Sequence, residues 1–199
     1  MVDYNFKPKR GRDEYGWHRR GYLPHFDGPE RTQFLTFRLF DSMPQELLAS
    51  WQRESRNDAD LRKKVEKYLD AGHGSNWLRQ ADVASLVCNS LQFHHSSKYD
   101  LDSWVIMPNH VHVLLTPLAG FHLDQVEHSI KSYTANEANK VLKRNGQFWA
   151  VECFDRYIRD RRHFDAVVRY IENNPVKAGL CGMPEDWPFS SAALGWKKG

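Results

Sequence analysis

The sequence LDSWVIMPNHVHVLL, residues 101–115, decides the fold of this chain. Two apolar segments, Leu101–Met107 and His110–Leu115, flank Pro108-Asn109, a dipeptide typical of tight turns, so we predict a β-hairpin. Side chains alternate along a strand, which places His110 and His112 on the same face. The opposite face of that strand is apolar and should point into a core: Val111, Val113 and Leu115.

Further elements on both sides of the hairpin predict an α+β domain around an antiparallel sheet flanked by helices. Residues 33–40 alternate in hydrophobicity like a strand, and residues 154–160 also resemble one. Helical spacing indicates two helices within 44–70 and further helices at 77–93, 124–144 and 163–173. Pro175 should help to end the last helix, because proline cannot continue the helical hydrogen bonding.

The composition limits the class of protein. A chain of 199 residues suits one domain, and its net charge of +3 permits a nucleic-acid partner without requiring one. The three cysteines are widely spaced and form no CxxC pair, which favours reduced, structural thiols. No apolar run approaches the roughly 20 residues of a membrane span, and the N-terminus does not resemble a signal peptide. We therefore expect a cytoplasmic protein.

The histidine pair is half of a metal site. Two imidazoles on one strand face can converge on one cation, but two ligands are too few for a closed site. The alternative is a structural histidine pair on a half-exposed strand, and the HxH pattern alone leaves both interpretations open. The metal interpretation requires a third ligand and a nucleophile that the metal would serve.

Two tyrosines on predicted helices are candidates for the nucleophile, and helical phase separates them. Tyr133 falls in the middle of the apolar stripe of its helix, which predicts a core or cleft-wall residue. Tyr170 falls on the flank of its stripe, and Asn174 lies one turn further on the same flank, so both polar groups can face one ion. The alternative is that Tyr170 is an amphipathic rim residue and Asn174 a helix-terminal one.

Several ordered motifs resemble the REP-associated tyrosine transposases, domesticated relatives of the single-tyrosine HUH transposases of bacterial insertion sequences. The strongest are MPNHVHVLL at 107–115, KSYTA at 131–135 and YIENNPVKAGL at 170–180. Two further segments, GWHRRGYLPHFD at 16–27 and DWPFSS at 186–191, are also similar. The resemblance therefore runs almost from end to end.

The resemblance implies a fold, a domain organisation and a set of site residues. It implies one ferredoxin-like HUH domain over residues 1–199, with a basic N-terminal arm at 1–30 and a helical insertion at 41–97. It also implies that His110 and His112 bind a divalent metal, Mg²⁺ or Mn²⁺, with Asn174 as the third protein ligand and Tyr170 as the nucleophile. Zinc is compatible with the imidazole ligands as well.

The implied activity is metal-dependent cleavage and joining of single-stranded DNA at palindromic, REP-like hairpins through a 5′-phosphotyrosine intermediate. Basic side chains are candidates for phosphate contacts, each with a solvated surface position as the alternative: Arg12, Arg19, Arg20, Lys131, Arg159, Arg161 and Arg162. One alternative function is a non-catalytic DNA hairpin-binding protein that retains the fold. Another is an HUH replication initiator or relaxase, for which this chain is short. The resemblance implies a nucleoid-associated protein with no membrane partner, either a monomer or a homodimer.

Overall fold

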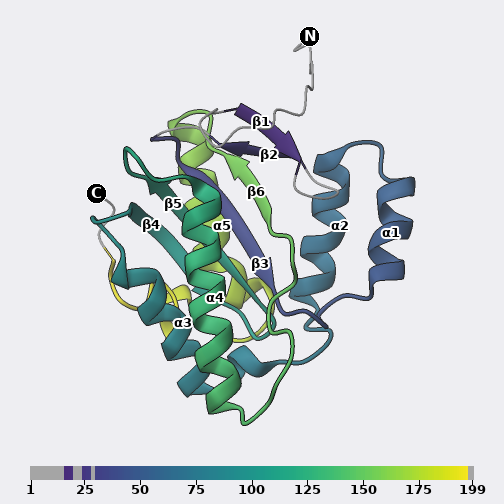
Figure 1. The fold of residues 1–199 in the computed structure, drawn as a ribbon, viewed down its shortest axis with the longest axis vertical. Helices are drawn as coiled ribbons and strands as arrows, with labels where there is room; N and C mark the ends of the chain where they lie inside the picture. Colours follow the sequence, from purple (N-terminus) through teal and green to yellow (C-terminus); the bar gives the residue numbers. More distant parts are fainter. Residues whose placement is uncertain (1–15, 20–23, 28–29, 197–199) are drawn as a thin grey trace.

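A four-stranded antiparallel sheet forms the centre of the protein (Figure 1), seen in a computed structural model that describes residues 16–19, 24–27 and 30–196. The strands lie in the order β4-β5-β3-β6. Their bounds are Gln33–Arg38 for β3, Tyr99–Ile106 for β4, His110–Pro117 for β5 and Phe154–Tyr157 for β6. All neighbouring strands are antiparallel, which confirms the predicted α+β fold and makes β5 an interior strand.

The predicted hairpin is confirmed. Strands β4 and β5 pair antiparallel, and the Met107 N–H donates to the His110 carbonyl at 2.9 Å to close the turn at Pro108-Asn109. The turn is also fixed from outside, since the Leu39 N–H donates to the Asn109 carbonyl at 2.8 Å. The histidine pair thus begins on a backbone that is held from two sides.

A second, two-stranded sheet pairs β1 (Gly16–Arg19) with β2 (Pro24–Asp27) in antiparallel register. The sequence predicted an irregular lead-in over residues 1–30, and that prediction is wrong for this pair of strands. The strands are short and lack alternating apolar residues, so periodicity gives no signal for them. The remainder of the basic arm, residues 1–15, lies outside the described residues.

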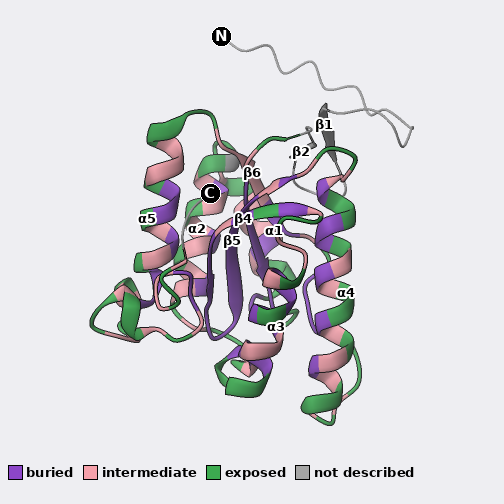
Figure 2. Ribbon diagram, turned by 90° about the vertical axis from the view of Figure 1, so that its left-hand side faces the viewer, coloured by how far each residue is buried: buried purple, intermediate pink, exposed green. Residues whose placement is uncertain are grey.

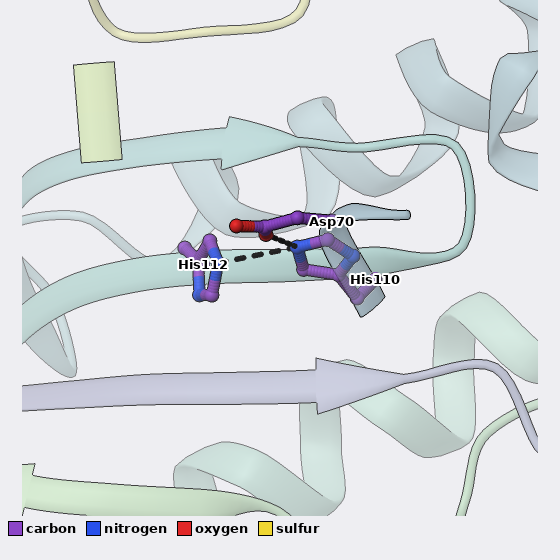
Figure 3. Close-up of side chains that lie close together, drawn as sticks. All are labelled: Asp70, His110 and His112. Atoms are coloured by element: carbon purple, nitrogen blue, oxygen red, sulfur yellow. Dashed lines mark hydrogen bonds and ion pairs between the residues drawn. The ribbon is translucent and has the colours of Figure 1, made fainter. Parts of the chain in front are cut away.

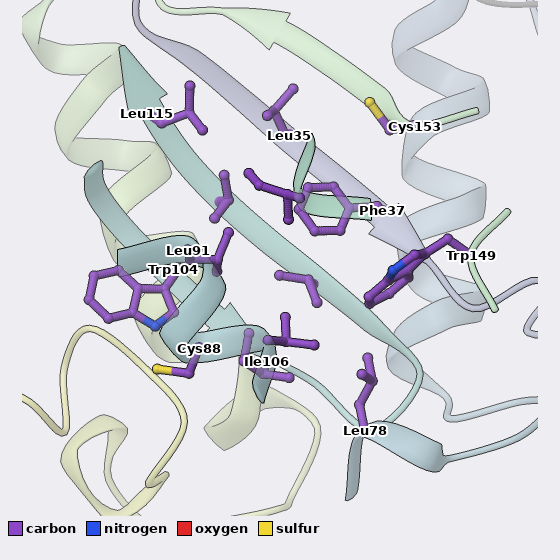
Figure 4. Packing of buried hydrophobic residues seen from close by; sticks show 14 of the residues in the cluster. Leu35, Phe37, Leu78, Cys88, Leu91, Trp104, Ile106, Leu115, Trp149 and Cys153 are labelled. Atoms are coloured by element: carbon purple, nitrogen blue, oxygen red, sulfur yellow. The ribbon is translucent and has the colours of Figure 1, made fainter. Parts of the chain in front are cut away.

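One face of the central sheet is covered by α3 (Ala81–Phe93), which follows the short 3-10 helix η1 (Trp77–Arg79), and by α4 (Leu123–Val141). Alternate residues of the strands point to this face and form the main hydrophobic core with the two helices (Figure 4). The predicted core residues of β5 are all in it: Val111, Val113 and Leu115. The apolar alternation of β5 therefore reserves its other face for the histidines.

Helix α4 differs in phase from the prediction. Tyr133 is 54% exposed rather than part of the core. The buried side of the helix instead contains Thr134, whose hydroxyl donates to the Ile130 carbonyl at 2.7 Å and accepts from the Trp149 indole at 2.9 Å. A polar residue with both roles satisfied can occupy a core position, and counting only apolar residues misplaced the stripe.

The other face of the sheet is covered by α5 (Arg161–Lys177), which packs Val167, Val168 and Ile171 against a second apolar cluster from β3, β4 and β5. In Figure 2 the sheet stands between α5 and α4. The prediction that Pro175 helps to end this helix is wrong, because the helix continues to Lys177. The residue that terminates it is Gly179, just beyond the last turn, which has φ +69°; the Leu180 N–H donates to the Pro175 carbonyl at 2.9 Å as in a Schellman motif.

Helices α1 (Gln45–Glu54) and α2 (Asp58–Asp70) form a hairpin beside the sheet, seen at the right of Figure 1. They share a small hydrophobic cluster of their own, which reaches the sheet through Phe154. The hairpin leaves and rejoins the fold at one point, where the Ser75 N–H donates to the Asp41 carboxylate at 3.1 Å. Within the range 41–97, α1 and α2 are thus a separate excursion, whereas α3 belongs to the main core.

The described residues include no helix long and apolar enough to cross a membrane.

Candidate metal and tyrosine site

The two histidines of β5 face each other on the side of the sheet that α5 covers. Their Nε2 atoms are 3.1 Å apart, and both residues are 0% exposed. The adjacent residue on that face, Leu114, packs with the residues of α5. The alternation of β5 places both imidazoles on one face, as the sequence predicted, and α5 covers that face.

Asn109 fixes the orientation and the tautomer of His110. Its amide nitrogen donates to two carbonyls, those of Leu69 at 3.3 Å and His73 at 2.8 Å, so its oxygen must face the imidazole. That oxygen lies 2.7 Å from Nδ1 of His110 and can only accept. Nδ1 therefore carries the proton, and Nε2 presents a lone pair toward His112.

Thr36 holds His112 in a similar way. Its hydroxyl lies 2.7 Å from Nδ1 of His112, across the strand pair that sets Thr36 opposite His112. A hydroxyl can accept from Nδ1–H, and in that arrangement Nε2 of His112 is also a free lone pair. Two fixed imidazoles then point their donor atoms at one position.

Burial keeps both imidazoles neutral. Desolvation lowers the pKa of His110 to about 4, a shift that the Asp70 carboxylate partly offsets. Desolvation also lowers the pKa of His112 well below its usual range, with His110 and Lys177 adding to the effect. A neutral imidazole is the form that binds a metal, so the pair is ready to act as a ligand at neutral pH.

Asp70, the last residue of α2, is an acidic group that the sequence did not predict in the site (Figure 3). Its Oδ1 lies 3.8 Å from Nε2 of His110. One donor atom from each of Asp70, His110 and His112 lie within 4.8 Å of one another. The α1–α2 excursion therefore supplies a carboxylate to the face that carries the histidines.

Tyr170 reaches the site from α5. Its hydroxyl is 3.5 Å from Nε2 of His112, and its ring packs edge-on against Phe34. Desolvation raises the pKa of Tyr170, and the carboxylates of Glu66 and Asp70 raise it further. The phenol is therefore protonated in this structure.

Asn174 lies one turn further along α5 and is 1% exposed. Its amide lies close enough to Tyr170 to lower the pKa of the phenol, the opposite of the larger effect of burial. Neither amide atom of Asn174 makes a hydrogen bond of normal geometry to a described residue. A buried amide without a partner is costly, which suits a group that binds a ligand.

The donor set fits a divalent cation. Two neutral imidazole nitrogens are joined by the Oδ1 of Asp70, which is buried and has no hydrogen-bond partner among the described residues. Asn174, whose amide lies close to the phenol of Tyr170, is a further candidate donor. Mixed nitrogen and oxygen donors suit Mn²⁺, Mg²⁺ or Zn²⁺.

Lys177 completes the charged surroundings. Its ammonium is 2.6 Å from Oδ2 of Asp70 and 5.7 Å from the centre of the Tyr170 ring. In the sequence, Lys177 lies within the YIENNPVKAGL motif, and no separate role was predicted for it. Its spacing of seven residues from Tyr170, two helical turns, was the available signal that both lie on one side of α5.

The predicted DNA-contact residues lie in separate parts of the structure. Lys131 is on α4, across the sheet from the histidines, and its ammonium donates to Glu127 and to the Val151 carbonyl. Arg159, Arg161 and Arg162 are exposed at the start of α5, and Arg161 pairs with Asp165 at 3.1 Å. Arg12 and Arg20 lie outside the described residues, and of Arg19 only the backbone is described. Their roles stay predictions.

The chain is similar in sequence to transposases. Residues 80–174 match the family described as "Transposase IS200 like". The matched range contains both histidines, Tyr170 and Asn174, and it excludes Asp70 with the rest of the α1–α2 excursion.

A REP-associated tyrosine transposase of Escherichia coli (strain K12) is 29% identical over 94 residues. That match covers 47% of this chain and 54% of the Escherichia coli protein, about half of each. Among solved structures, a REP-associated tyrosine transposase bound to a REP hairpin is similar with a TM-score of 0.57 at 21% identity. The likeness covers 90% of this chain and 87% of the other, and it concerns the fold.

Proposed function

We propose that this chain, a relative of the REP-associated tyrosine transposases, cleaves and rejoins single-stranded DNA at hairpins, with Tyr170 as the nucleophile. The observation that carries the proposal is the position of the Tyr170 hydroxyl, 3.5 Å from a histidine pair that can hold a divalent cation. A tyrosine is too weak a nucleophile at neutral pH without help. A phenol beside a cation site is therefore the expected arrangement for phosphodiester attack.

His110, His112 and Asp70 would hold the cation, with Asn174 as a further ligand. When bound, a divalent cation draws charge from a phosphodiester and orients it. Asn109 and Thr36 contribute by fixing the imidazoles, which keeps the donor atoms in place without rearrangement during the reaction. The amide donor predicted from the sequence and the carboxylate found in the structure are complementary in this proposal.

The proposed reaction exchanges one phosphodiester for another. A bond forms between Oη of Tyr170 and phosphorus, and the bond from phosphorus to the 3′ oxygen breaks. The proton lost by the phenol balances the proton gained by the leaving 3′ oxygen. The products are a 5′-phosphotyrosine and a free 3′-hydroxyl, which can attack in reverse or join another end, so no energy source is consumed.

Cleavage of an end-labelled hairpin tests the proposal. With Mn²⁺, a label on the 3′ side of the cleaved bond should appear in a protein adduct on a denaturing gel, and a label on the 5′ side should appear as free DNA. Tyr133→Phe is the matched control for Tyr170→Phe, which cannot form the adduct. Loss of the exposed Tyr133 hydroxyl should leave the adduct unchanged. An adduct that carries the 5′-side label would contradict the proposed polarity of attack.

A second candidate function is hairpin binding without catalysis. The observation in its favour is that both histidines of the pair are buried in this structure. A binding protein of this kind would retain the hairpin with equal affinity in Mn²⁺ and in EDTA and release no fragment. The labelled-hairpin experiment separates the two functions directly.

A further inference from the structure

The carboxylate of Asp70 has two oxygens in two different environments. Oδ2 accepts from the Lys177 ammonium at 2.6 Å, whereas Oδ1 faces Nε2 of His110 at 3.8 Å without a hydrogen bond. The side chain of Asp70 is 11% exposed, and that of Lys177 is 60% exposed. One partner is thus held in the site, and the other can leave it.

The charges at the site change when a cation binds. Without one, the Asp70 carboxylate and the Lys177 ammonium balance each other across their 2.6 Å ion pair. A divalent cation beside Oδ1 would neutralise the carboxylate charge that now attracts Lys177, and it would repel the ammonium. The attraction between the Lys177 ammonium and Oδ2 of Asp70 is then weaker.

We propose that Lys177 and a divalent cation compete for Asp70, so that binding of the cation frees the Lys177 ammonium to bind a phosphate of the DNA strand. The inference rests on the proposed function and assigns a substrate contact within it. Lys177 and Tyr170 lie on one side of α5, and the ammonium is 5.7 Å from the tyrosine ring. A phosphate near the tyrosine hydroxyl is therefore within reach of a flexible lysine that already lies beside that ring.

Binding of Mn²⁺ alone tests the competition. We expect Lys177→Met to lower the Kd for Mn²⁺ by about two- to fivefold, the size of effect that a partly exposed ion pair supports. Lys177→Arg keeps the charge and should bind Mn²⁺ as the wild type does. If Lys177→Met weakens Mn²⁺ binding or leaves it unchanged, Lys177 does not compete with the cation. Titration by calorimetry or by the spectrum of free Mn²⁺ gives the values.

The salt dependence of DNA binding tests the phosphate contact. In a Tyr170→Phe background, which cannot form the adduct, the affinity for a fluorescent single-stranded hairpin is measured against salt with Mn²⁺ and with EDTA. Each lost phosphate contact reduces the slope of log K against log salt by about 0.7 for single strands. Lys177→Met should reduce the slope with Mn²⁺ but leave it unchanged in EDTA. A reduction in both conditions, or in neither, would overturn the exchange.

The outcome also separates this inference from the proposed function. If His112→Ala retains full Mn²⁺ affinity, or the wild type binds no Mn²⁺, the metal site itself is wrong and both proposals fail. If Mn²⁺ binding requires His112 while Lys177→Met does not tighten it, only the exchange at Asp70 fails. The two readouts need no cleavage activity.

Discussion

Replacing His110 with asparagine should make the metal-free protein less sensitive to acid. The asparagine side chain keeps a donor near the position of Nδ1, so it can still donate to Asn109, but it cannot be protonated. In the wild type, burial lowers the pKa of His110 from 6.5 to about 4. The unfolded chain therefore binds more protons than the folded chain between these values, and folding stability falls as the pH falls through this window.

The magnitude follows from the shift. The fall in the pKa of His110 from 6.5 to about 4 corresponds to about 3 kcal/mol of stability, fully lost only below pH 4. At pH 5 about 2 kcal/mol of it is lost relative to pH 7.5. The variant should lack this part of the pH dependence and retain the part that comes from His112 and other groups.

Urea denaturation in EDTA at pH 7.5 and pH 5.0 measures the effect. The wild type should lose about 2 kcal/mol more than His110→Asn between the two pH values. The same substitution at His128, whose side chain is exposed on α4, should retain the wild-type loss. Equal losses in wild type and His110→Asn would refute the claim that His110 is held neutral by burial.

Three further substitutions test other parts of the structure. Thr36→Val removes the hydroxyl that holds Nδ1 of His112 and should weaken Mn²⁺ binding about tenfold or more by calorimetry. The control Thr32→Val removes a hydrogen bond to Thr116 and should leave Mn²⁺ binding unchanged. Gly74→Ala should lower Tm by several degrees, because φ is +79° and a Cβ would lie 2.4 Å from the Asp41 carbonyl oxygen. Gly72→Ala, with φ +75° and nothing within 4 Å, should cost less, and equal losses would contradict the close approach at Gly74. Tyr133→Phe should change stability by less than about 0.5 kcal/mol, since the side chain is 54% exposed; a larger loss in urea denaturation would mean that this tyrosine is packed.

The elements that carry the histidines and the tyrosine were predictable from the sequence. Period-two alternation placed His110 and His112 opposite the core residues of β5, and helical phase placed Tyr170 and Asn174 on the flank of the apolar stripe of α5. Both inferences depend only on local geometry, which the order of residues determines. The structure agrees with both placements, although the roles of the residues stay proposals.

The position of Asp70 beside His110 was not predictable from the sequence, because it depends on tertiary structure. It lies forty residues before His110, at the end of a helix whose spacing gives no relation to the sheet. Its position follows from two hydrogen bonds: the Ser75 N–H donates to the Asp41 carboxylate, and the Asn109 amide donates to the Leu69 carbonyl. These contacts join segments far apart in the chain, and no periodic pattern encodes them.

The errors on α4 and α5 have local causes. Apolar residues alone predict the wrong buried side of α4, because Thr134 is buried there with its hydroxyl both donating and accepting a hydrogen bond. Pro175 removes only one donor within the last turn, and the conformation of Gly179 ends the helix instead.

Peptide mapping of the DNA adduct tests the central claim most directly. The protein is incubated with a hairpin oligonucleotide and Mn²⁺, digested with trypsin and nuclease, and analysed by mass spectrometry. We predict a nucleotide attached through phosphate to Tyr170, present in the wild type and absent when His112 is replaced by alanine. An adduct on another residue, or one that forms equally well without His112, would contradict the account.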